Sequence, residues 1–94
     1  MTVYIVSRVT ITDPGEMAEY MKGAPATVEQ YGGTYLARTS DFEALEGETD
    51  FDRVVILSFP SKEDAMAWYN SKEYKPLLAQ RWSSADAQII LVNA

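Results

Sequence analysis

Three predicted strands of this chain are apolar on both of their faces. They span Val3–Ile11, Arg53–Phe59 and Gln88–Val92, and all are rich in β-branched residues, which favour strands. Neighbouring side chains of a strand point to opposite faces, so a sheet with one face in water should alternate apolar and polar residues. The apolar residues that break this alternation are Tyr4, Val6, Val54, Ile56, Ile90 and Val92. A sheet of these strands therefore needs cover on both faces.

Two helix-start signals follow predicted strands. Asp13 can cap a helix with Glu16 three residues on, and Pro14 is tolerated at a first helical position. Ser61 with Asp64 repeats the pattern in the second half. The apolar stripe of the first helix consists of Met17, Tyr20, Met21, Ala24, Val28 and Tyr31, before Gly32–Gly33 ends it.

Both helical regions are expected to be interrupted. Pro25 cannot donate a hydrogen bond to the carbonyl of Met21, which predicts a kink or break after Gly23. Ser71 offers a second cap in the later region, which predicts two helical pieces there.

The remaining strand follows the first helix. Thr34–Arg38 is predicted as a strand that continues over Phe42–Glu46 after a bulge or turn near Ser40–Asp41, with Gly47–Asp52 as a polar loop. The resulting order is β-α-β-β-α-β within one domain over residues 1–94. It predicts an α+β, ferredoxin-like fold with a four-stranded antiparallel sheet and both helices on one face.

That arrangement leaves one apolar face of the sheet bare. Monomeric proteins in water rarely expose so large an apolar patch, so we expect a homodimer in which two sheets face each other across a two-fold axis. The alternative is a monomer with an unusually apolar sheet.

Composition narrows the chemistry further. The chain has no Cys and no His, so thiolate nucleophiles, histidine bases and their metal sites are excluded, and no metal or cofactor is expected. Its net charge of −6, with scattered Lys and Arg, argues against a nucleic-acid partner. The N-terminal apolar run is broken by Arg8 and no segment is long enough to span a membrane, so we expect a cytoplasmic protein without a membrane partner.

Several short motifs resemble, in the same order, the pattern of domain of unknown function 1330. They are Tyr31-Gly32-Gly33, Leu36-Ala37-Arg38, Leu45-Glu46-Gly47, Phe59-Pro60-Ser61, Ala67-Trp68-Tyr69, Ser71-x-x-Tyr74 and Arg81. The resemblance implies membership of the dimeric α+β barrel superfamily, in which two ferredoxin-like protomers join their sheets. It implies no activity, because relatives with this fold range from cofactor-free monooxygenases to isomerases and ligand-binding proteins.

Two pairs of residues suggest a ligand pocket, each with a structural alternative. Arg38 and Glu46 could form an ion pair that only ties the chain, or Arg38 could receive a substrate carboxylate or enolate. Tyr74 and Arg81 lie two helical turns apart, and Arg81 could hold an anion or pair with Asp86.

Trp68 and Tyr69 complete the set of pocket candidates. Aromatic residues on a helix that faces a sheet usually belong to the core, but buried Trp N–H and Tyr O–H groups also supply the polar points of small-ligand pockets. The resulting hypothesis is a pocket between sheet and helices for a small aromatic or carboxylate-bearing metabolite, with cofactor-free isomerase or monooxygenase-like chemistry as an extension. The alternative is a dimeric binding or assembly module without turnover.

Overall fold

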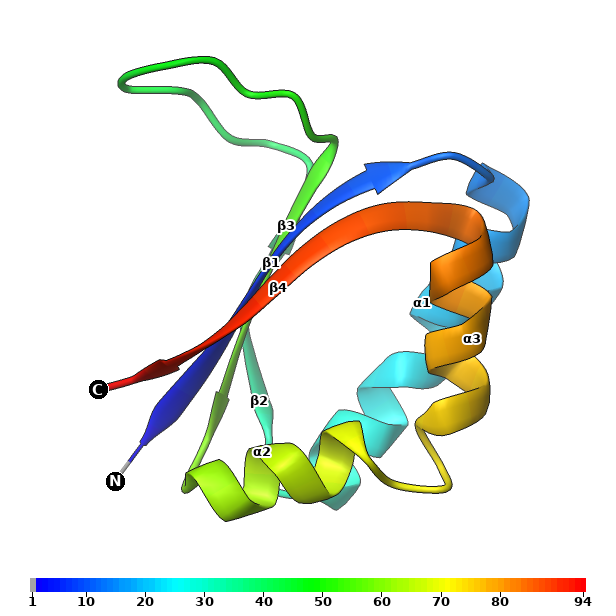
Figure 1. Cartoon of the computed structure of the whole chain (residues 1–94), viewed down its shortest axis with the longest axis vertical. Coiled ribbons are helices and arrows are strands. Elements are labelled where there is room, and N and C mark those ends of the chain that lie inside the picture. Colours follow the sequence, from blue (N-terminus) through cyan, green and yellow to red (C-terminus); the bar gives the residue numbers. More distant parts are fainter. Residues whose placement is uncertain (1) are drawn as a thin grey trace.

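The computed structural model describes residues 2–94 and places a four-stranded antiparallel sheet against three helices (Figure 1). The elements are β1 (Val3–Ile11), α1 (Pro14–Gln30), β2 (Thr34–Thr39), β3 (Arg53–Phe59), α2 (Lys62–Tyr69), α3 (Lys75–Ser84) and β4 (Ala85–Asn93). The strands lie in the order β2-β3-β1-β4. This is the predicted ferredoxin-like α+β fold.

Local capping signals explain where the helices begin. Asp13 Oδ1 accepts a hydrogen bond from Glu16 N at 3.1 Å, and Ser61 Oγ accepts one from Asp64 N at 3.1 Å. Ser71 Oγ accepts one from the backbone N of Tyr74 at 3.1 Å, just before α3 begins. The predicted caps Asp13 and Ser61 and the division of the second helical region are thus confirmed. The predicted cap Ser71 instead closes the turn before α3, whose N-cap is Tyr74 and whose first turn has no side-chain cap.

The two faces of the sheet have different surroundings. All three helices lie on one side of it (Figure 1), and on this covered face Ile5 pairs with Leu57, both buried. On the other face Val6 aligns with Ile56 on one neighbour and with Ile90 on the other, and Ile90 is 59% exposed. We call this second face, which carries Tyr4, Val6, Ile56, Ile90 and Val92, the uncovered face.

The predicted break in the first helix is wrong, and its alternative, a kink after Gly23, stays a prediction. α1 runs without interruption from Pro14 to Gln30, with Pro25 inside it. A proline removes one helical hydrogen bond. Its neighbours Ala24 and Val28 are buried, and this packing of the apolar stripe holds the helix together across the proline.

The predicted strand over Phe42–Glu46 is also wrong. Residues 40–52 form a loop that leaves the sheet on the side away from the helices (Figure 1). Extending β2 would require residues 47–52 to form the partner strand, and these are mainly acidic or polar. Instead Phe42 stacks on Phe51 with ring centroids 5.0 Å apart, and Asp52 accepts a hydrogen bond from Ile11 N at 2.9 Å.

The two glycines after α1 serve different purposes. Gly32 has φ +81°, the left-handed conformation expected where a helix ends. Gly33 has no such backbone requirement, but a Cβ there would lie 2.6 Å from Val28 and 2.7 Å from Phe59. Gly33 therefore allows the start of β2 to approach the core closely, a role the sequence did not reveal.

No helix within residues 2–94 has the length and apolar character needed to cross a membrane.

Candidate functional site

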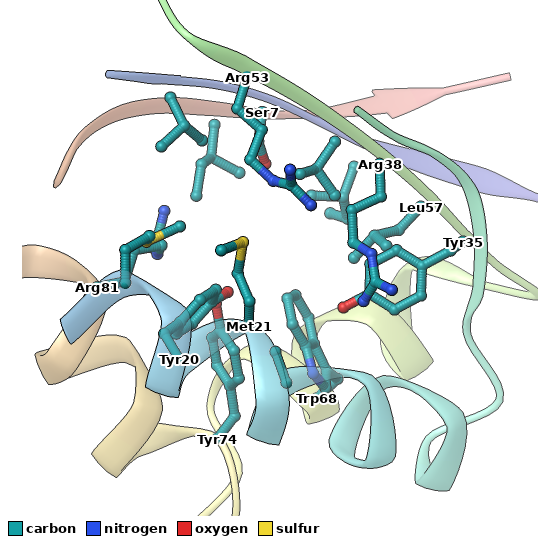
Figure 2. Close-up of a pocket in the computed structure, with 16 residues that line it drawn as sticks. Ser7, Tyr20, Met21, Tyr35, Arg38, Arg53, Leu57, Trp68, Tyr74 and Arg81 are labelled. Atoms are coloured by element: carbon teal, nitrogen blue, oxygen red, sulfur yellow. The ribbon is translucent and has the colours of Figure 1, made fainter. Parts of the chain in front are cut away.

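A cavity lies between the covered face of the sheet and the helices (Figure 2). Its volume is about 40 Å³, counted over the positions that the centre of a water molecule can occupy. On this measure a single water needs roughly 10–15 Å³, so the space holds about three waters or one compact ligand. The sheet supplies one wall and α1, α2 and α3 supply the opposite one.

Three of the four arginines of this acidic chain line the cavity. Arg38 comes from β2, Arg53 from β3 and Arg81 from α3, and no Asp or Glu belongs to the lining. Within residues 2–94 the single ion pair is Lys22–Glu19, which lies on the surface. The cavity thus gathers positive charge without a counter-ion from the part of the chain that the structure describes.

A β-bulge brings Arg38 to the covered face. Tyr35 pairs with Leu57 while Arg38 pairs with Val55, although Tyr35 and Arg38 are three residues apart on their strand. The register shift between Tyr35 and Ala37 makes this possible, because it inserts one extra residue and redirects the side chains that follow. The guanidinium carbon of Arg38 then lies 4.9 Å from the centre of the Tyr35 ring.

Arg53 is the diagonal neighbour of Arg38 across the β2–β3 pair. It lies two residues before Val55, the residue that Arg38 faces, and therefore on the same side of the sheet. Figure 2 shows both guanidinium groups reaching into the same space. Burial, together with the nearby charge of Arg38, lowers the pKa of Arg53. An arginine nevertheless remains cationic at neutral pH, so the two like charges repel each other.

Arg81 is the most deeply buried charge. Only 4% of the residue is exposed, and its Nε atom has no hydrogen-bond partner, as is also true of Arg53 Nε. Buried charges in proteins are normally paired, since removing an ion from water costs several kcal/mol. The buried Arg81 and the half-buried Arg53, together with the exposed Arg38, are therefore arranged as an anion-binding site would be.

A pair of tyrosines lies below the arginines. The hydroxyl groups of Tyr20 and Tyr74 are 2.6 Å apart, and Figure 2 shows the pair between Arg81 and Met21. Burial is the main cause that raises the pKa of Tyr20 and of Tyr74, and the positive charge of Arg81 partly offsets it in both. Both hydroxyls are therefore protonated at neutral pH and are suited to donate hydrogen bonds.

Trp68 is both a core residue and a wall of the cavity. It is 3% exposed, its indole N–H donates to Thr27 Oγ1 at 3.1 Å, and its ring centroid lies 4.2 Å from that of Tyr74. Its polar atom is thus already satisfied inside the protein. Toward the cavity Trp68 offers an aromatic surface.

The six residues singled out from the sequence separate into two groups. Arg38, Trp68, Tyr74 and Arg81 line the same cavity. Glu46 lies exposed in the loop after β2, where it forms no ion pair with Arg38. Tyr69 packs beside Trp68 and Tyr74 with ring centroids 6.1 Å from each, but it does not line the cavity.

The alternative partner of Arg81 is placed elsewhere. Asp86 pairs with Thr10 of β1, and it lines a separate surface hollow that also contains Arg8. Thr10 is an even number of residues from Val6, so both belong to the uncovered face. Asp86 and Arg81 therefore form no ion pair.

Arg53 and Ser7 were not predicted from the sequence as residues of the cavity. Both stand at positions of the covered face where apolar residues are otherwise the rule: Ser7 lies between Ile5 and Val9, and Arg53 precedes Val55 by two. The available signal was this polar interruption of an apolar period of two. Tyr20 was assigned to the apolar stripe of α1, but its hydroxyl group points to this site.

No group of three or more Asp or Glu side chains within residues 2–94 is arranged to hold a metal ion.

Solved structures of low sequence identity share this fold. A protein of unknown function from Rhodopseudomonas palustris has a TM-score of 0.80 at 18% identity, covering 99% of this chain and 82% of that one. SnoaB, a cofactor-independent oxygenase from Streptomyces nogalater, has a TM-score of 0.74 at 17% identity, with 99% and 92% covered. A dimeric ferredoxin-like protein of unknown function from Jannaschia sp. CCS1 has a TM-score of 0.71 at 13% identity, with 100% of each covered. At such identities the likeness shows the fold alone.

The sequence, compared with known families, shows the family to which the chain belongs. None of the curated proteins matches the chain. The family described as Domain of unknown function (DUF1330) matches residues 2–94, which includes every element of the fold and all the residues of the cavity. The chain therefore belongs to the DUF1330 family.

Proposed function

We propose that the cavity binds a compact organic anion, a carboxylate or an enolate carried on a small apolar or aromatic body. The observation behind this proposal is the gathering of Arg38, Arg53 and Arg81 around one space with no acidic residue in its lining. Guanidinium groups match the geometry of carboxylates, and charge-assisted hydrogen bonds of this kind are about twice as strong as neutral ones.

The rest of the lining suits the body of such a ligand. Trp68, Met21 and Leu57 offer apolar surface, while Tyr20 and Tyr74 add hydroxyl donors. Ligand pockets commonly combine an apolar lining with a few convergent polar groups. The small volume favours a ligand of few atoms over an extended one.

Catalysis is the second candidate function, and the lining of the cavity limits the substrates that could react there. Among residues 2–94, neither a carboxylate nor a lysine lines the cavity, and its tyrosines are protonated at neutral pH. A side-chain general base is therefore not at hand in this part of the chain. Turnover would require a substrate that ionises readily and whose anion the arginines stabilise. The cofactor-independent oxygenase with the same fold is consistent with such chemistry. Binding without turnover, the alternative function, uses the same cavity.

We also propose that two copies of the chain associate through the uncovered face. Val6, Ile56 and Ile90 form an aligned apolar row on it, and solved structures with this fold include dimeric ferredoxin-like proteins. A second copy presents the same row, so a two-fold axis would match apolar surface with apolar surface. Cytoplasmic localisation remains a prediction.

A panel of small acids tests the binding proposal. Thermal unfolding should be followed with aromatic acids and keto acids at millimolar concentration. A binding acid present at about ten times its Kd should raise Tm by about 5 °C or more. Arg53→Gln should reduce this shift. Lys62→Gln, which deletes one positive charge from an exposed residue outside the cavity, should keep it. If no acid stabilises the protein, or if Arg53→Gln keeps the full shift, the proposal is wrong.

A further inference from the structure

The three arginines of the cavity are divided between two opposite walls. Arg38 and Arg53 are diagonal neighbours on the sheet, whereas Arg81 extends from α3 (Figure 2). Their surroundings differ accordingly: Arg53 is affected by the charge of Arg38, and the charge of Arg81 acts on the tyrosines of the helical side. Positive charge thus lies at two ends of one small space.

A ligand with a single negative group could reach only one of these ends well. Placed between Arg38 and Arg53, it would relieve their mutual repulsion but leave the buried Arg81 without a counter-ion. Placed beside Arg81, it would leave the half-buried Arg53 and the exposed Arg38 to repel each other. Each arrangement therefore leaves part of the binding energy of the site unused, because a buried charge without a counter-ion and two neighbouring like charges are both unfavourable.

From this division we infer that the ligand is a compact dianion, with one anionic group held by Arg38 and Arg53 and the other by Arg81. The inference rests on the proposed anion-binding function and narrows its ligand class. A short dicarboxylate, or a carboxylate whose enolate or phenolate supplies the second charge, has this chemistry. The Tyr20–Tyr74 hydroxyl pair beside Arg81 can donate to the second group.

Pairs of acids that differ by one carboxylate test this inference. Succinate is compared with butyrate, and malonate with propionate, by calorimetric titration at pH 7.5 and constant ionic strength. Constant ionic strength matters because salt screens charge interactions. Each dicarboxylate should bind at least about tenfold more tightly than its matched monocarboxylate, the usual gain from one additional charged contact.

Two variants locate the second charge. In Arg81→Met the dicarboxylate and its matched monocarboxylate should bind with about equal affinity, because both are then held by the sheet-side arginines alone. Arg53→Gln should weaken both acids of a pair and provides a second test should Arg81→Met fail to fold. Lys62→Gln should leave every affinity unchanged.

The possible results separate this inference from the function on which it rests. Equal affinity for matched mono- and dicarboxylates would overturn the inference that the ligand is a dianion, and the proposed anion binding would still stand. A dicarboxylate preference that survives in Arg81→Met would overturn the assignment of the second group to Arg81. If no acid of either kind binds the wild-type protein, the proposed function fails together with the inference.

Discussion

The covered and uncovered faces of the sheet are built from similar residues, but their arginines differ in the hydrogen-bond partners that they have. On the uncovered face Arg8 donates to the Gln88 side chain, and its guanidinium carbon lies 5.4 Å from the centre of the Phe51 ring. On the covered face Arg53 has a buried Nε atom without any partner. Arg8 thus has a hydrogen-bond partner near the surface, where water could also bind it, whereas the half-buried Arg53 keeps one buried nitrogen without a partner.

The buried Nε atom of Arg53 should lower the stability of the free protein, because it has no hydrogen-bond partner. An unpaired buried polar group generally costs about 1–3 kcal/mol, and such groups are expected where a ligand completes the site. Apolar residues on the covered face form the core, whereas those on the uncovered face have no helix packed against them.

The largest effect is expected from the core part of the covered face. Trp68→Ala should lower the free energy of unfolding by about 3–5 kcal/mol, because it leaves a void against Phe59 and Tyr74 and removes the partner of Thr27. Chemical denaturation measures this change. Leu45→Ala, at a residue that is 94% exposed, is the matched control and should change stability by less than about 0.5 kcal/mol. A mild effect at Trp68 would mean that its side chain is not part of the core.

A charge on the uncovered face should act on association rather than folding. Ile56→Lys places an ammonium group in the apolar row and should weaken the dimer by a factor of about 100 or more, equivalent to roughly 3 kcal/mol. Sedimentation equilibrium at micromolar concentration measures this. Far-ultraviolet circular dichroism should remain that of the folded chain. A wild-type protein that sediments as a monomer would contradict the proposed interface.

Removing the most buried charge should stabilise the free protein. Arg81→Met replaces an unpaired guanidinium with an apolar side chain, so the free energy of unfolding should rise by about 1–3 kcal/mol in the absence of ligand. Arg8→Met provides the contrast, because that arginine already has partners and should gain nothing. Loss of stability in Arg81→Met would show that Arg81 serves the fold.

The smallest effect concerns the tyrosine pair. Tyr20→Phe removes the 2.6 Å hydroxyl contact with Tyr74 and should cost about 0.5–1.5 kcal/mol.

The same pair makes stability depend on alkaline pH. The pKa of Tyr20 is raised well above its ordinary value of 10.0, chiefly by burial, so its proton stays bound in the folded state when the unfolded chain has lost it. Stability should therefore be unaffected by this group below about pH 10 and should decrease as pH rises above it. Denaturation curves at pH 8, 10 and 11 should show a smaller decrease for Tyr20→Phe than for the wild-type protein. An equal decrease in both would exclude Tyr20 as the source.

A feature of the fold could be predicted from the sequence when the residues that cause it lie close together along the chain. Asp13 and Ser61 cap helices through contacts three residues away, so local sequence was sufficient to identify them. The bulge after Tyr35 depends on how β2 aligns with β3, and the sequence suggested an irregularity several residues later. Glu46 was chosen as the partner of Arg38 for its charge, but its loop does not return to the sheet.

The cavity could be predicted only in part, because its residues are distant from one another along the chain. Arg38, Trp68, Tyr74 and Arg81 were singled out from the sequence, but their meeting in one space is a product of the tertiary structure. Arg53 was missed although strand periodicity alone places it on the same face as Val55. An arginine on an otherwise apolar strand face was the informative signal.

Nuclear magnetic resonance of the arginine Nε–Hε groups can show whether the cavity arginines together bind an organic anion. During titration with succinate, the signals of Arg38, Arg53 and Arg81 should shift together with a single Kd. The signal of Arg8, outside the cavity and already partnered, should stay in place. Signals from the three cavity arginines that do not respond, or a response at Arg8 alone, would contradict the account.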